Sequence, residues 1–100
     1  MAKEIVKIFP DYCSSGVWDS NGCNCDPDEF GISPGLRIAL KYWHDFWEYQ
    51  IANISSDAAG NPIIEALVPE RLINQWREDG HKLAELMSAE NDRYEFIARL

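Results

Sequence analysis

The stretch "SPGLRIALKYWHDFWEYQIANI", residues 33–54, predicts the central helix of this chain. Ser33 is a good N-cap, and Pro34 suits the first helical position, where its missing N–H costs nothing. Apolar residues then recur at alternating spacings of four and three, which is the helical period. They are Leu36, Leu40, Trp43, Trp47, Ile51 and Ile54. We therefore predict an amphipathic helix over residues 34–54.

The other positions of this helix divide into a polar face and an additional aromatic sector. The polar face contains Arg37, Lys41, His44, Asp45 and Glu48. On such a face His44 is expected to be exposed to solvent. Tyr42, Phe46 and Tyr49 widen the apolar sector beyond what one packing neighbour requires. We therefore expect this helix to be contacted on more than one side.

A second helix is predicted over residues 69–87, beginning at Pro69. Its apolar stripe consists of Leu72, Ile73, Trp76, Gly80, Leu83, Ala84 and Met87. In a helix interior Gly80 costs roughly 1 kcal/mol relative to alanine. Because Gly80 lies on the apolar stripe, its missing side chain would permit a close approach between the two helices.

The two ends of the chain have strand patterns. "EIVKIF", residues 4–9, is rich in β-branched residues and is followed by Pro10, and residues 94–100 alternate between apolar and polar. A final helical turn is the alternative for 94–100. If both are strands, pairing them gives each a partner. The prediction is one α+β domain over residues 1–100, with two central amphipathic helices, short N- and C-terminal strands and a long acidic loop.

That acidic loop is predicted over residues 10–35, because Pro, Gly, Ser, Asn and Asp dominate and no regular period persists. No Lys or Arg occurs from Ile8 to Leu36, whereas five acids do: Asp11, Asp19, Asp26, Asp28 and Glu29. One interpretation is a polar loop with its aromatic residues in the core. The other is a protein-binding face, in which Tyr12 and Trp18 are anchors framed by carboxylates.

Charge and composition limit the partners. Nine Lys and Arg against seventeen Asp and Glu give a net charge of −8. Such a surface repels phosphate, so direct binding of nucleic acid or of an anionic membrane is not expected, whereas a basic protein would be attracted. The sequence has no secretory signal and no apolar run of 18 residues, which favours a cytoplasmic protein.

The three cysteines, Cys13, Cys23 and Cys25, have the spacing C-x9-C-x-C. Structural zinc sites use wider C-x2–4-C pairs, so ordinary reduced thiols are the first interpretation. A small metal-binding or regulatory protein that uses these three residues is the alternative. Cys13, Ser14 or Ser15 could pair with His44 or His81 as nucleophile and base, but no pattern in the sequence places them together. We expect neither catalysis nor a cofactor.

"FPDYCSSGVWDSNGCNCDPDEFGISPGL" (9–36), followed by "KYWHDFWEYQ" (41–50), resembles a group of small bacterial immunity proteins. These belong to contact-dependent growth inhibition and related polymorphic toxin systems, and share roughly "DYCSSGLW…G.NIDP..L.IS..L…W". The resemblance covers about residues 5–50. The matching residues are Asp11, Tyr12, Ser15, Gly16, Trp18, Asp26, Pro27, Ser33 and Leu36. Cys23 and Cys25 depart from the pattern, which weakens the metal interpretation.

The resemblance implies a function: binding one cognate toxin domain in the cytoplasm and blocking its active site, as a monomer in a 1:1 complex. Such toxins are often nucleases, whose active sites are basic because they bind phosphate, so an acidic inhibitor is complementary to them. We favour a ribonuclease as the target. The carboxylates expected to contact it are Asp19, Asp26, Asp28 and Glu29, with Trp18 and Tyr12 as anchors or as supports of the loop. Asp45 and Glu48 on the helix are the alternative surface.

Overall fold

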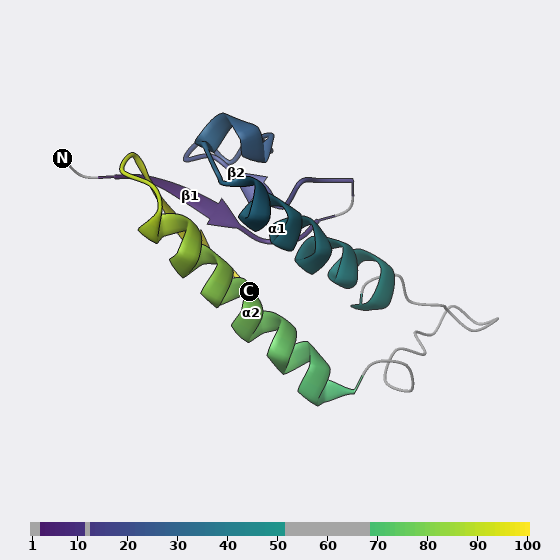
Figure 1. Ribbon diagram of the computed structural model, residues 1–100. Coiled ribbons are helices and arrows are strands. Elements are labelled where there is room, and N and C mark those ends of the chain that lie inside the picture. Colours follow the sequence, from purple (N-terminus) through teal and green to yellow (C-terminus); the bar gives the residue numbers. More distant parts are fainter. Residues whose placement is uncertain (1–2, 12, 52–68) are drawn as a thin grey trace.

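A computed structural model describes residues 3–11, 13–51 and 69–100 (Figure 1). It contains two long helices and a three-stranded sheet, which confirms the predicted α+β fold. The elements in chain order are strand β1 (Glu4–Ile8), strand β2 (Val17–Trp18), 3-10 helix η1 (Pro27–Phe30), helix α1 (Pro34–Phe46), π-helical turn η2 (Trp47–Ile51), helix α2 (Glu70–Ala89) and strand β3 (Tyr94–Ala98). Residues 52–54 of the predicted first helix lie outside the described residues.

The sheet has the strand order β2–β1–β3. β1 and β3 pair in parallel, with Val6 opposite Phe96, so the two ends of the chain form one ladder as predicted. The C-terminal segment is therefore a strand and not a last helical turn. β2 pairs with β1 in the antiparallel sense, with Val17 opposite Ile8.

The hydrophobic core lies between this sheet and the two helices. Alternate residues of each strand point into it, because side chains of a strand alternate between its two faces. The buried strand residues are Val6, Ile8, Val17, Phe96 and Ala98, and the buried apolar helix residues include Leu40, Trp43, Trp76, Leu83 and Met87. Each large apolar side chain that is fully buried contributes about 1.5–3 kcal/mol.

α1 and α2 lie side by side and run in opposite directions (Figure 1). Their contact is built on Trp43 and Trp76, whose rings stack with centroids 4.7 Å apart and planes 2° from parallel. Trp43 Nε1 donates to the carbonyl of Trp76 at 2.7 Å, and Trp76 Nε1 donates to the carbonyl of Trp43 at 2.8 Å. Both indole N–H groups are therefore satisfied in the core, as buried donors need to be.

Gly80 lies against this tryptophan pair. A Cβ at this position would lie 2.6 Å from Trp43 Cζ2 and 2.7 Å from Leu100 Cδ1. No room exists for a side chain here. The close approach predicted for Gly80 is confirmed.

At the two outer edges of the sheet, side chains of the same chain form hydrogen bonds with backbone N–H and carbonyl groups of the edge strands. At β3, Ser88 Oγ accepts a hydrogen bond from the N–H of Phe96 at 2.8 Å, and Asn91 Oδ1 accepts one from the N–H of Tyr94 at 3.0 Å. At β2, the carbonyl of Val17 accepts from Asn24 Nδ2 at 2.9 Å. Backbone groups that would otherwise template a further strand are thus occupied at these positions.

The composition of residues 10–35 predicted a loop without regular structure. This prediction is wrong in part, because β2 and η1 lie within these residues. A strand of two residues has no period for a sequence pattern to reveal, and η1 has only four residues. Within the described residues, no helix combines the length and the apolar character needed to span a membrane.

Candidate functional site

The segment of residues 9–31, here called the acidic segment, is held against α1 by His44. This histidine is 3% exposed, so the prediction that it lies in solvent is wrong. Its Nε2 is 2.9 Å from the carbonyl oxygen of Asp11. Gly16 packs on the ring: a Cβ there would lie 3.0 Å from His44 Cδ2, and its φ of +84° favours glycine. His44 is buried because the acidic segment folds over the polar face of α1.

The same contact brings together a serine, a histidine and an aspartate. Ser14 Oγ is 3.2 Å from His44 Nε2, and His44 Nδ1 is 4.0 Å from Asp45 Oδ1. His44 Nε2 thus lies 2.9 Å from the carbonyl oxygen of Asp11, and the N–H of Asp11 donates to Nε2 at 3.4 Å. Ser14 Oγ in turn donates to that carbonyl at 2.9 Å. His44 Nε2 therefore contacts Asp11 and Ser14 together, and the arrangement positions the acidic segment on α1.

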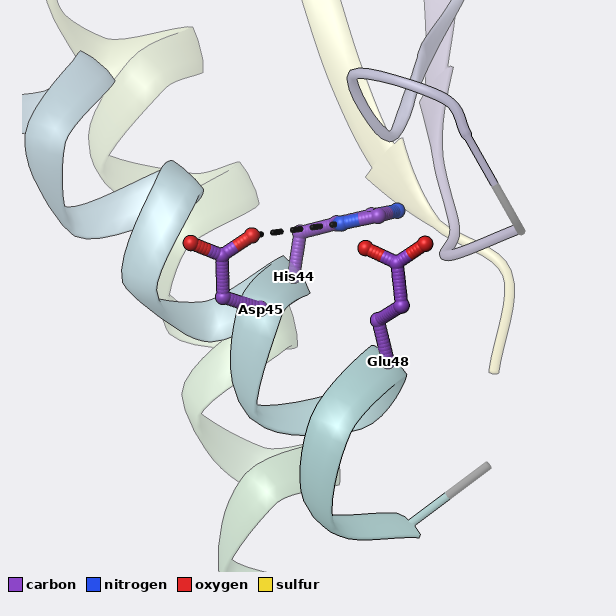
Figure 2. Close-up of side chains that lie close together, drawn as sticks. All are labelled: His44, Asp45 and Glu48. Atoms are coloured by element: carbon purple, nitrogen blue, oxygen red, sulfur yellow. Dashed lines mark ion pairs between the residues drawn. The ribbon is translucent and has the colours of Figure 1, made fainter. Parts of the chain in front are cut away.

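His44 and Asp45 of α1 and Glu48 of η2 form a cluster (Figure 2). In the described part of the chain they are the one group of three or more potential metal ligands whose atoms lie within 4.8 Å of one another. Both carboxylates already have partners. Asp45 Oδ2 pairs with Lys41 Nζ at 2.9 Å, which raises the pKa of Lys41, and Glu48 Oε1 accepts from the N–H of Cys13 at 3.2 Å. The cluster thus fastens the acidic segment to α1.

None of the three cysteines belongs to that cluster, and all three are free thiols. Cys13 and Cys23 are exposed, whereas Cys25 is half-buried. Burial raises the pKa of Cys25, and the nearby charges of Asp19 and Glu29 add to this effect. A thiol with a raised pKa is a weaker nucleophile and a weaker metal ligand at neutral pH, because the thiolate is the reactive form.

Asp19 organises the turn that follows β2. Its Oδ1 accepts hydrogen bonds from the backbone N–H groups of Asn21 and Cys23, both at 2.9 Å. These bonds hold the pKa of Asp19 below its ordinary value of 3.8, and the bond from Cys23 has the largest effect. The sequence assigned Asp19 to a partner surface, whereas in the structure its carboxylate faces its own backbone.

Acid is expected to loosen this turn. Because the pKa of Asp19 is lower in the folded state, its carboxylate stabilises the fold above pH 3.8, and that contribution is lost as the pH falls below this value. The amide signals of Asn21 and Cys23 in NMR spectra should shift with a midpoint below 3.8. In Asp19→Asn this step should be missing, with the Met87 amide as a reference for the intact core. A midpoint at or above the ordinary value would contradict the assigned role.

Three further acids lie on η1 and at its start. Asp26 is the N-cap, with its Oδ1 accepting from the N–H of Asp28 at 3.0 Å. Asp28 forms an ion pair with Arg37 of α1, and Glu29 is exposed. Arg37 thus brings a base to a segment that has none in its own sequence. The contact between Arg37 and Asp28 forms only when α1 and η1 pack together, so the charge pattern along the chain did not reveal it.

Of the two aromatic residues expected to be anchors or supports, Trp18 and Tyr12, the structure describes only Trp18. Trp18 is half-buried and stacks on Phe9, with ring centroids 4.6 Å apart. Its Nε1 donates to the carbonyl of Phe9 at 2.9 Å. Trp18 therefore supports the acidic segment from within the fold. Tyr12 lies outside the described residues.

The two surfaces that the sequence treated as alternatives meet at one cavity. It measures about 380 Å³ and is lined by Asp26 and Asp28 of the acidic segment and by Asp45 of α1. Arg37 and Lys41 also line it, and pair with Asp28 and Asp45 respectively. We call this the acidic cavity. The sequence could not join its two halves, because the contacts of His44 and Arg37 that join them are non-local.

Comparison with known proteins gives no relative: the chain matches no protein-family model and no curated protein.

Proposed function

We propose that this chain is an immunity protein, which binds a cognate toxin domain of a contact-dependent growth inhibition system and blocks its active site. The observation that carries the proposal is the acidic cavity, where carboxylates from two parts of the chain converge. The net charge of −8 supports it, because a nuclease active site is basic and would be drawn to such a surface. A ribonuclease is the favoured target. The resemblance of residues 5–50 to immunity proteins points in the same direction.

The ion pairs at the cavity suit a surface that exchanges partners. The side chains of Arg37 and Asp28 are 37% and 62% exposed. Exposed ion pairs of this kind contribute only about 0–1 kcal/mol. Lysines and arginines of a toxin could therefore replace Arg37 and Lys41 at little cost. Until then, these internal pairs hold the carboxylates in position.

The mechanism is occlusion without chemistry. The carboxylates meet the phosphate-binding groups of the toxin, so that its nucleic acid substrate is excluded. The protein acts in the cytoplasm, as a monomer with one toxin domain, and needs no cofactor.

Charge reversal tests this surface. Asp26→Lys/Asp28→Lys, which reverses two carboxylates of the cavity lining, should slow association with a basic cognate toxin domain by at least about tenfold at low salt. Glu78→Lys/Glu85→Lys is the matched control, since these two acids are exposed on α2 and the net charge changes equally. Stopped-flow mixing measures the rates.

Equal slowing by both double variants would show that only net charge matters, and would remove the acidic cavity as the contact. If the wild-type chain neither binds that toxin domain nor protects cells that produce it, the proposed function is wrong.

A further inference from the structure

A second surface lies on the opposite flank of α1. It is a groove of about 570 Å³ between α1 and α2, and the stacked pair Trp43 and Trp76 belongs to its lining. Tyr42 lines it from α1, and Leu72 and Leu86 line it from α2. Helical periodicity places Tyr42 away from Lys41 and His44, which face the acidic cavity.

The groove exposes apolar side chains that the fold does not use. Tyr42 is 73% exposed, Leu72 42% and Leu86 46%. Leu72, Asp79 and Leu86 recur every seven residues, so they form one seam along α2. Contiguous apolar surface on a small protein commonly marks a protein-binding site. The aromatic sector of α1, which predicted a contact on more than one side, includes Tyr42 in this groove.

The shape and charge of the groove indicate what it would bind. Strand addition is hindered where Ser88 and Asn91 occupy the β3 edge, whereas a groove between two helices accepts the apolar face of a third. Asp79 lies midway between the two leucines and accepts a hydrogen bond from Gln75 at 3.0 Å, which is an uncharged partner. Lys82 lines the same wall one turn further on. A matching helix would carry a base opposite Asp79 and no base opposite Lys82.

We infer that the groove binds an amphipathic helix of the toxin domain, with apolar side chains against Tyr42, Leu72 and Leu86 and a Lys or Arg at Asp79. This inference rests on the proposed function. α1 then lies between two contacts with one partner, the acidic cavity on one flank and the groove on the other. The two contacts have different roles, because exposed charges mainly raise the association rate, whereas buried apolar anchors mainly slow dissociation.

Substitutions in the groove should therefore change dissociation. Leu72→Ser/Leu86→Ser is expected to raise the dissociation rate of the cognate toxin domain roughly 100-fold, as loss of two anchor residues does. Ile5→Ser/Ile97→Ser is the control, because these residues lie on the other face of β1 and β3 from the buried Val6 and Phe96. Asp79→Lys should raise that rate far more than Glu78→Lys, which makes the same charge change at the adjacent residue. Biolayer interferometry measures the rates, and circular dichroism checks that each variant is folded.

The outcomes separate the two proposals. If the wild-type chain binds the toxin domain and Leu72→Ser/Leu86→Ser dissociates no faster, the groove inference is wrong and the proposed function stands. If the wild-type chain binds no toxin domain, a synthetic 18-residue peptide with Leu at the a and d heptad positions, one Lys to face Asp79 and Gln elsewhere, still tests the groove. It should bind the wild type at least tenfold more tightly than a scrambled peptide, and equal binding of the two would overturn the inference.

Two other occupants would also overturn it. Sedimentation of a wild-type dimer that Leu72→Ser/Leu86→Ser abolishes would assign the groove to a second copy of this chain. The changes in Tm caused by Leu72→Ser/Leu86→Ser and by Ile63→Ser/Ile64→Ser can be compared with the change in the combined variant. If the two changes are not additive, the groove would be assigned to the chain's own residues 63–68.

Discussion

Trp76→Ala is expected to lower the free energy of unfolding by about 3–5 kcal/mol, the range for removal of a buried aromatic side chain. Trp76 is 8% exposed and stacks on Trp43. The substitution removes the stacking surface and the hydrogen bond to the carbonyl of Trp43, and it takes away the partner that orders Trp43 itself. For a domain of this size each kcal/mol corresponds to roughly 4–8 °C in Tm. Urea unfolding followed by circular dichroism measures the change.

Trp76→Phe separates the two contributions. It keeps a ring for stacking and loses the N–H donor, so a smaller loss of about 1–2 kcal/mol is expected. If Trp76→Ala cost no more than a surface substitution, about 0.5 kcal/mol, the tryptophan pair would not hold the helices together.

Gly80→Ala is expected to destabilise the protein by about 1–3 kcal/mol, the cost of overpacking a core. The sign is informative, because alanine is favoured over glycine in a helix interior by about 1 kcal/mol. Here the added Cβ would lie 2.6 Å from the rigid indole of Trp43, and nothing but a shift of α2 against α1 relieves that contact. Thermal unfolding followed by calorimetry measures the effect.

Gly35→Ala is the matched control. Gly35 is also helical, in the first turn of α1, but a Cβ there meets no atom within 4 Å. Its replacement should leave Tm unchanged or raise it slightly. A rise in Tm for Gly80→Ala as well would mean that α1 and α2 are not held at the separation seen here.

Local patterns predicted the parts of this fold that depend on periodicity. The apolar stripe of α2, including the place of Gly80 on it, follows from residues three and four apart, and the alternation at residues 94–100 indicated β3. The pairing of β1 with β3 was predicted because each isolated strand needed a partner. These inferences succeed because burial of one face imposes a regular pattern on the sequence.

The site was predicted less well, because tertiary contacts decide it. His44 lies among polar residues in the helical pattern, yet the acidic segment covers it, and Asp11 and Ser14 contact it from 33 and 30 residues away. Asp19 and Trp18 form hydrogen bonds to the backbone of their own segment, and for Trp18 this supporting role was one of the two that the sequence predicted. Arg37 was assigned only to the polar face of α1, and its pairing with Asp28 joins two surfaces that the sequence kept apart. None of these outcomes leaves a local periodic signal.

The parallel pairing of β1 with β3 has a consequence for synthesis of the protein. Val6 and Phe96 are neighbours in the sheet, although 90 residues separate them along the chain. β1, the central strand, therefore leaves the ribosome long before its partner β3 exists, and among the described strands only the two-residue β2 can pair with it in the meantime. Because a two-stranded pair of this size is not stable alone, the sheet should form only after residue 98 has emerged. Nascent chains stalled before β3 should accordingly remain sensitive to protease, while the released chain resists it.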